Sequence, residues 1–150
     1  MVEQKARTIR ELRSSGYKPL SVKQEMRKNL IKRIEAGQTH FPGIIGYEDT
    51  VVPHLENAIL SGQDIIFLGE RGQAKSRLIR SLMSLLDDEM PIIAGCEIND
   101  NPFSPICKRC RDLVDSDSHH TDIEWVDRER RYGEKLATPD ITIADLIGEV

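Results

Sequence analysis

The sequence predicts an α/β fold in which a parallel sheet is flanked by helices, and three adjoining features support that prediction. Residues 65–68 form a short, continuous apolar run, which is typical of a strand buried on both faces. A glycine-containing turn follows at 69–76, and apolar residues then recur at helical spacing over 78–86. A buried strand, a tight loop and a helix in this order form the repeating unit of parallel α/β sheets.

The loop between the predicted strand and helix has the residues of a phosphate-binding site. It departs from the P-loop pattern G-x-x-x-x-G-K-[ST] at one position. It reads Gly69, Glu70, Arg71, Gly72, Gln73, Ala74, Lys75 and Ser76. Backbone N–H groups of such a loop, with the positive end of the following helix, bind anions. We expect Lys75 to act as the catalytic residue that reaches the β- and γ-phosphates, and Ser76 to bind Mg²⁺.

Alanine at position 74 is the departure from the pattern. It stands directly before Lys75, where we expect the chain to enter the helix. With helical dihedral angles its methyl group meets no steric penalty, and Ala favours helix over Gly by about 1 kcal/mol. We therefore predict a helical Ala74 and a functional loop, and we include Arg77 of the first helical turn among the nucleotide contacts.

The segment before the strand, residues 43–63, predicts a turn, a helix and a stop. Asp49 or Thr50 can cap the helix, and Gly62 can end it. Three residues are expected to form its buried face: Leu55, Ala58 and Ile59.

The N-terminal residues 1–40 predict a basic helical arm. Residues 1–37 hold 10 Lys/Arg and 4 Asp/Glu, although the whole chain has a net charge of −4. Ser21 and Gln24 form a capping-box pattern that starts a helix. Its apolar stripe consists of Val22, Met26, Leu30 and Ile34. The basic residues are either the solvated face of a helix packed on the body, or a surface for nucleic acid or a protein partner. Within the helix pattern at 21–37, no aromatic residue lies among the basic ones to stack on bases.

Composition limits the class of protein. The 150 residues are 39% hydrophobic and 31% charged, and no apolar run reaches the roughly 20 residues of a membrane-spanning helix. The N-terminus lacks the apolar middle of a secretory signal, and three cysteines do not make a disulfide framework. These features predict a cytoplasmic protein without membrane partners.

A cysteine cluster is the second candidate site. Cys107 and Cys110 have the spacing of a metal knuckle, and Cys96 and His119 can complete a tetrahedral zinc site. The alternative is three reduced thiols without a metal. Basic neighbours of Cys107 and Cys110 also favour adventitious oxidation.

Residues 41–150 resemble a known family. The stretch GIIGYEDTVVPHLENAILSGQDIIFLGERGQAKSRLIRSL closely resembles the start of the ATPase module of the AAA+ superfamily. More narrowly it is similar to the MoxR and magnesium-chelatase ATPase-subunit branch, where Ala before the loop lysine is a familiar variant. The resemblance implies that Ile45, Gly46 and Tyr47 pack near adenine. The later ADLIG, at 144–148, is also similar to this branch.

The resemblance further implies a function. Members of this branch form rings, usually hexamers, bind ATP with Mg²⁺, and use hydrolysis to remodel a partner protein or to insert a metal. Hydrolysis needs a second acidic motif at a strand end. The acidic residues at 87–89 lie at the far end of the loop's helix, and an arginine interrupts those at 127–129. We therefore expect 41–150 to be the N-terminal part of an ATPase core that binds nucleotide without efficient hydrolysis.

Other readings stay open. One is a zinc-stabilised interaction or nucleic-acid-binding module with a vestigial P-loop. A P-loop GTPase would need a guanine-reading N-K-x-D, and the chain has none. Residues 128–135 are expected to be a mixed-charge surface turn from which one arginine could face a neighbouring subunit.

Overall fold

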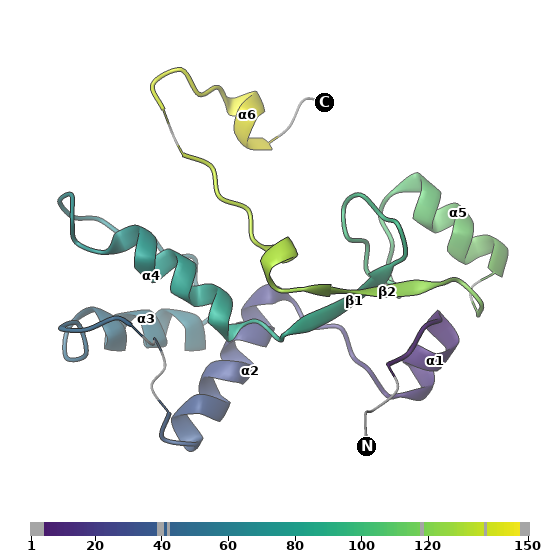
Figure 1. Ribbon diagram of the computed structural model, residues 1–150, viewed down its shortest axis with the longest axis horizontal. Helices are drawn as coiled ribbons and strands as arrows, with labels where there is room; N and C mark the ends of the chain where they lie inside the picture. The colour runs from purple at the N-terminus through teal and green to yellow at the C-terminus, as the bar shows by residue number, and fades with distance from the viewer. Residues whose placement is uncertain (1–4, 39–40, 42, 118, 137, 148–150) are drawn as a thin grey trace.

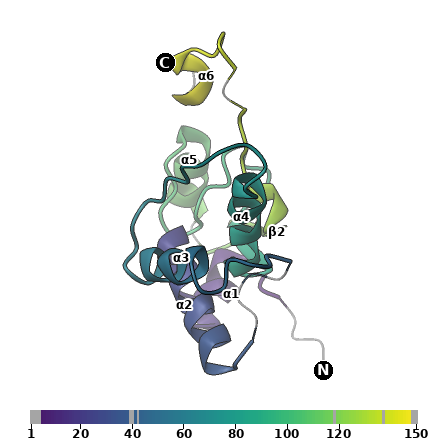
Figure 2. The ribbon, with the colours of Figure 1, turned by 90° about the vertical axis from the view of Figure 1, so that its left-hand side faces the viewer.

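The computed structural model describes residues 5–38, 41, 43–117, 119–136 and 138–147. Its elements are α1 (Ile9–Ser14), α2 (Val22–Glu35), α3 (Val51–Leu60), α4 (Lys75–Ser81), the 3₁₀ helix η1 (Leu82–Leu85), β1 (Glu89–Ile93), α5 (Lys108–Asp117), β2 (Ile123–Asp127), the 3₁₀ helix η2 (Glu129–Arg131) and α6 (Ile143–Ile147). Helices α2, α3 and α4 gather on one side, and α1, α5 and the two strands lie on the other (Figure 1). Helix α6 stands apart from both groups (Figure 2). No helix within the described ranges is long and apolar enough to cross a membrane.

Helices α2, α3 and α4 share one apolar core. Its fully buried members are Leu30, Phe41, Ile44, Leu55, Ile59, Leu78 and Leu85. The predicted burial of Leu55 and Ile59 is confirmed, and Ala58 is half-buried. Of the predicted stripe in α2, Leu30 is fully buried and Met26 is partly buried against this core. Val22 and Ile34 remain exposed.

The start of α2 follows the prediction. The Gln24 N–H donates to Ser21 Oγ over 3.3 Å, and the Ser21 N–H donates to Gln24 Oε1 over 3.0 Å. This reciprocal capping box satisfies N–H groups that have no partner inside the helix.

The basic face of α2 packs on the body of the protein. Lys28 Nζ lies 2.7 Å from a carboxylate oxygen of Asp87, and Lys23 Nζ lies 2.9 Å from one of Asp64. These contacts favour the packed-helix reading of the arm over the docking-surface reading. The predicted boundary at 40 and 41 touches residues 39 and 40, which lie outside the described ranges.

The segment predicted as a buried strand is different in the structure. Residues 65–68 form no strand, and the described chain contains no parallel sheet. Ile65 and Phe67 pack against the helical core, whereas Ile66 is 83% exposed and Leu68 is 89% exposed. The prediction that this run is buried on both sides is therefore wrong for the described residues, because no described element packs over the Ile66 and Leu68 side chains.

The sheet that forms is an antiparallel pair that the sequence did not predict. Strand β1 pairs with β2, with Pro91 opposite Trp125 and Ile93 opposite Ile123. Helix α1 covers this pair through Ile9 and Leu12, which form a second core with Ile123. The Trp125 indole N–H donates to the carbonyl of Ala6 over 2.9 Å.

A buried ion pair joins the two halves. Arg131 of η2 donates to both carboxylate oxygens of Glu25 in α2, at 2.8 and 2.5 Å. The side chains are only 7% and 6% exposed. The Asp87 N–H, between η1 and β1, donates to the same Glu25 carboxylate over 2.6 Å. Arg131 thus forms a buried ion pair, whereas the sequence predicted a mixed-charge surface turn at 128–135.

Removing one partner of this pair should destabilise the fold strongly. We expect Arg131→Leu to lower the unfolding free energy by about 3–5 kcal/mol, because it leaves the Glu25 carboxylate buried without a counter-charge. Arg130→Leu, one residue away at an exposed position, should stay within about 0.5 kcal/mol of wild type. Denaturant titration measures both values, and equal losses would contradict the structural role of Arg131.

Acid should remove the contribution of the Asp87 carboxylate to the stability of the fold. Burial opposes its ionisation, but hydrogen bonds from Lys28 and Asn29 hold the pKa of Asp87 below its ordinary value. A depressed carboxyl pKa stabilises the fold above the unfolded value, about 4, and this stabilisation disappears as pH falls through the folded value. The stability difference between wild type and Asp87→Asn should therefore shrink from neutral pH to about pH 3 in denaturant titrations. A stability difference between the two proteins that does not change with pH would rule out this role of the Asp87 carboxylate.

Candidate functional site

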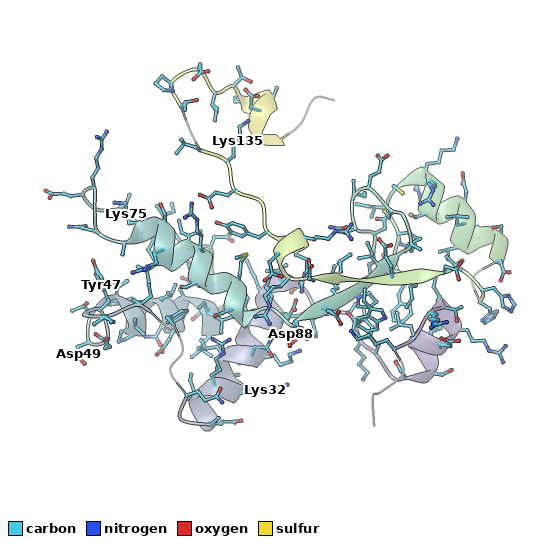
Figure 3. The ribbon with its side chains drawn as sticks, in the orientation of Figure 1. Lys32, Tyr47, Asp49, Lys75, Asp88 and Lys135 are labelled. Carbon is cyan, nitrogen blue, oxygen red and sulfur yellow. The ribbon has the colours of Figure 1, made fainter. Side chains whose placement is uncertain are left out.

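The main candidate site is a pocket of about 280 Å³ beside the glycine-containing loop. Its lining comes from the start of α3, the 65–68 segment, the loop and α4. These residues are Tyr47, Val51, His54, Leu55, Ile65, Ile66, Phe67, Leu68, Gln73, Lys75 and Leu78. Tyr47 and Lys75 lie at the same end of the molecule (Figure 3). The pocket thus has an apolar wall, and Gln73 and Lys75 line it on the side of the loop.

The loop carbonyls accept hydrogen bonds from the lysine at the end of the loop. Lys75 Nζ donates to the carbonyls of Gly69 and Glu70, at 2.8 and 2.5 Å. The Glu70 N–H donates to Gln73 Oε1 over 3.1 Å. Gly72 has φ +82°, a conformation that L side chains rarely adopt. The ammonium therefore lies against two carbonyls of the loop, whereas the groups expected to surround an anion are the backbone N–H groups of the loop.

The backbone conformation of Ala74 differs from the predicted helical one. It is the N-cap of α4, with φ 52° and ψ 16°, in the left-handed region. The prediction of helical dihedral angles at this position is wrong, because the chain must reverse here before α4 starts. A left-handed alanine costs roughly 1–2 kcal/mol relative to a relaxed backbone. The glycine of the P-loop pattern would avoid this cost.

The other predicted nucleotide contacts lie around the loop, most of them open to solvent. Ser76 and Arg77 occupy the first turn of α4 and are exposed, as are Glu70, Arg71 and Gly72. Upstream, Tyr47 lines the pocket, whereas Ile45 is 84% exposed and Gly46 is exposed in a turn. Of the predicted adenine-side group, only Tyr47 reaches the pocket.

Sequence reasoning missed the contribution of α3. Val51, His54 and Leu55 line the pocket from one face of this helix. Residues three and four positions after Val51 share its face of a helix, so this spacing could have indicated that the three residues line one site.

The acidic segments considered for a second motif are engaged elsewhere. Asp87 accepts from Lys28 and Asn29, and Asp88 pairs with Arg128. Asp88 lies at the opposite end of the α4–η1 segment from Lys75 (Figure 3). Asp127 ends β2, where it accepts the N–H of Arg130 over 3.1 Å. None of these carboxylates lines the pocket.

The cysteines form a second, separate cluster. One ligand atom from each of Cys96, Asp100, Cys107 and Cys110 lies within 4.8 Å of the other three. Three of the four predicted zinc ligands therefore come together. Asp100, rather than the predicted His119, is the fourth member; His119 is exposed after the end of α5.

Hydrogen bonds set the protonation of this cluster. Burial alone would raise the pKa of Asp100, but the Cys107 thiol and the N–H groups of Ile106 and Cys107 hold it at about 2. Burial likewise opposes ionisation of Cys96, whereas N–H groups of Asp100 and Ile98 lower its pKa. Burial raises the pKa of Cys110. The cluster thus has an ionised carboxylate among thiols of unequal acidity.

Comparison with known proteins gives one partial likeness. Over 75 residues the chain is 35% identical to a protein of Methanocaldococcus jannaschii described as a magnesium-chelatase subunit ChlI homolog. The aligned part is 48% of this chain and 20% of that protein, so the chain spans about one fifth of its relative's length. No family model matches the chain, and no solved structure matches it. The chain is therefore similar to a magnesium-chelatase subunit homolog over about half of its length.

Replacing Ala74 by glycine tests the geometry of the loop. Because Ala74 is left-handed, Ala74→Gly should raise the unfolding free energy by about 1 kcal/mol. The matched control is Ala58→Gly inside α3, which should lower it by about 1 kcal/mol. Denaturant titration of both variants gives opposite signs if the loop is as described. A loss at both positions would show that Ala74 is helical.

Proposed function

We propose that this chain is the nucleotide-binding part of an AAA+ ATPase of the magnesium-chelatase type. The observation that supports this best is the shared pocket, which brings Tyr47 together with Gln73 and Lys75 of the loop. The partial likeness to a magnesium-chelatase subunit homolog supports the same class. In this proposal residues 65–68 belong to a parallel sheet of P-loop type.

The loop would bind the phosphates of Mg·ATP. Lys75 would exchange its two carbonyl partners, Gly69 and Glu70, for phosphate oxygens, which are stronger acceptors because they are charged. N–H groups between 69 and 76 would supply further donors, and the Ser76 hydroxyl in the first turn of α4 would bind Mg²⁺. Tyr47 and the apolar wall from α3 would contact the base.

The finer assignments extend this proposal. Hydrolysis would be coupled to remodelling of a partner protein or to metal insertion within a ring of subunits, as in the MoxR and magnesium-chelatase branch. The second reading is a zinc-stabilised interaction or nucleic-acid-binding module with a vestigial P-loop, and it leaves the pocket without a nucleotide.

Nucleotide binding should depend on Lys75. We expect a fluorescent ATP analogue with Mg²⁺ to bind wild type, and Lys75→Ala to weaken binding about 10- to 100-fold, the loss of a charge-assisted hydrogen bond. Lys32→Ala removes an equal charge from the exposed face of α2 and should leave affinity unchanged. Fluorescence anisotropy measures all three.

Two results would decide against the proposal. Equal affinities of wild type and Lys75→Ala would remove the loop from the binding site. Equal weakening by Lys32→Ala would indicate binding through overall charge alone. Tyr47→Ala should weaken ATP but spare inorganic tripolyphosphate, which has no base; equal effects on both ligands would exclude a base contact at Tyr47.

A further inference from the structure

We propose that Cys96, Asp100, Cys107 and Cys110 bind one structural zinc ion. The four ligand atoms already lie within 4.8 Å of one another. In a tetrahedral site with Zn–S bonds of about 2.3 Å, ligand sulfurs are about 3.8 Å apart. Small side-chain movements would therefore bring the four atoms to bonding positions around one ion. An iron–sulfur cluster needs its cysteine sulfurs spread around several metal and sulfide atoms, and this group is too compact for that.

The backbone around the cluster is arranged for thiolate ligands. The Asp100 N–H donates to Cys96 Sγ, and the Cys110 N–H donates to Cys107 Sγ, each over 3.3 Å. Such donors stabilise a sulfur in its thiolate form, the form that binds a metal. Asn99, with φ 56°, supplies the reversal that brings the Asp100 N–H back to Cys96.

Asp100 is held in an orientation that leaves both carboxylate oxygens able to accept again. Oδ1 accepts the Ile106 N–H and Oδ2 accepts the Cys107 N–H, each at 3.0 Å. An ionised carboxylate has about four lone-pair sites, so these two bonds leave capacity for a metal. The same bonds fix the position of the carboxylate, as hydrogen-bonded partners of metal ligands do.

Burial and charge indicate a structural site rather than a catalytic one. Cys96, Asp100 and Cys110 are buried, and Cys107 is partly buried. Four protein ligands close a tetrahedral site, whereas catalytic zinc keeps an open position. Three thiolates and a carboxylate around Zn²⁺ would leave net negative charge. The Arg109 guanidinium, which donates to the Gly95 carbonyl over 3.1 Å, lies beside the site to offset it.

A metal would also hold a long segment that has no regular secondary structure. Residues 94–107, between β1 and α5, contain no helix or strand. Among the described residues, the apolar cluster beside this segment has Ile93, Cys96 and Cys110 as its buried members. Connections of this length without regular structure are uncommon in compact domains, and metal binding to such a segment contributes folding free energy.

The test uses the full chain, without a histidine tag and kept reduced. After chelator treatment and incubation with zinc alone, elemental analysis should find about one zinc per chain, and zinc should raise the melting temperature. Cobalt substitution should give thiolate-to-metal absorption with the visible bands of a tetrahedral site. Cys110→Ser and Asp100→Asn should each weaken zinc binding at least tenfold in competition with a chelating dye. His119→Ala, the matched control, should retain wild-type affinity.

Several results would overturn the proposal. The site is excluded if wild type binds no stoichiometric zinc and zinc does not change its melting temperature. This test does not depend on whether a variant folds. If anaerobic preparations contain iron and sulfide, the site holds an iron–sulfur cluster and the zinc proposal is wrong. Loss of zinc in His119→Ala, or full affinity in Asp100→Asn, removes Asp100 as the fourth ligand. Nucleotide binding is measured separately, so failure here leaves the proposed function untouched.

Discussion

The buried ion pair between Glu25 and Arg131 is the contact on which the arrangement of this protein depends. It crosses 106 residues of sequence and joins α2, in the helical half, to η2, which follows the antiparallel strand β2. Each charge would be costly to bury alone, and the pair is tolerated because both carboxylate oxygens receive a guanidinium donor and one also receives the Asp87 N–H. Glu25 therefore ties three segments at the junction of the two halves.

That junction has consequences for both candidate sites. With α2 held, Leu30 packs in the core that supports α3 and α4, and these helices place Tyr47 and Lys75 around one pocket. On the other side, Ile93 at the end of β1 packs with Cys96 and with Cys110 of α5 at the cysteine cluster. The two sites lie in different halves, so a nucleotide at one and an ion at the other are compatible. In the two proposals the ion would stabilise the fold, and the loop would bind the nucleotide.

Local signals in the sequence were reliable where neighbours in the chain determine structure. The capping box of Ser21 and Gln24, and the buried face of α3, follow from spacing alone, and the structure contains them. Contacts between distant residues were not accessible in this way. Nothing near Glu25 marks it as the partner of Arg131, and nothing near Cys96 marks Asp100 over His119 as the fourth member of the cluster. The left-handed Ala74 was missed for another reason: helix propensity describes residues inside a helix, and Ala74 is the cap before it.

Hydrogen exchange with and without Mg·ATP tests the central claim most directly, because it reports the loop amides themselves. The account predicts slower exchange at 69–78 and across the start of α3, with residues 94–110 unchanged. Unaltered exchange at 69–78 in saturating nucleotide, or protection confined to the cysteine cluster, would contradict it.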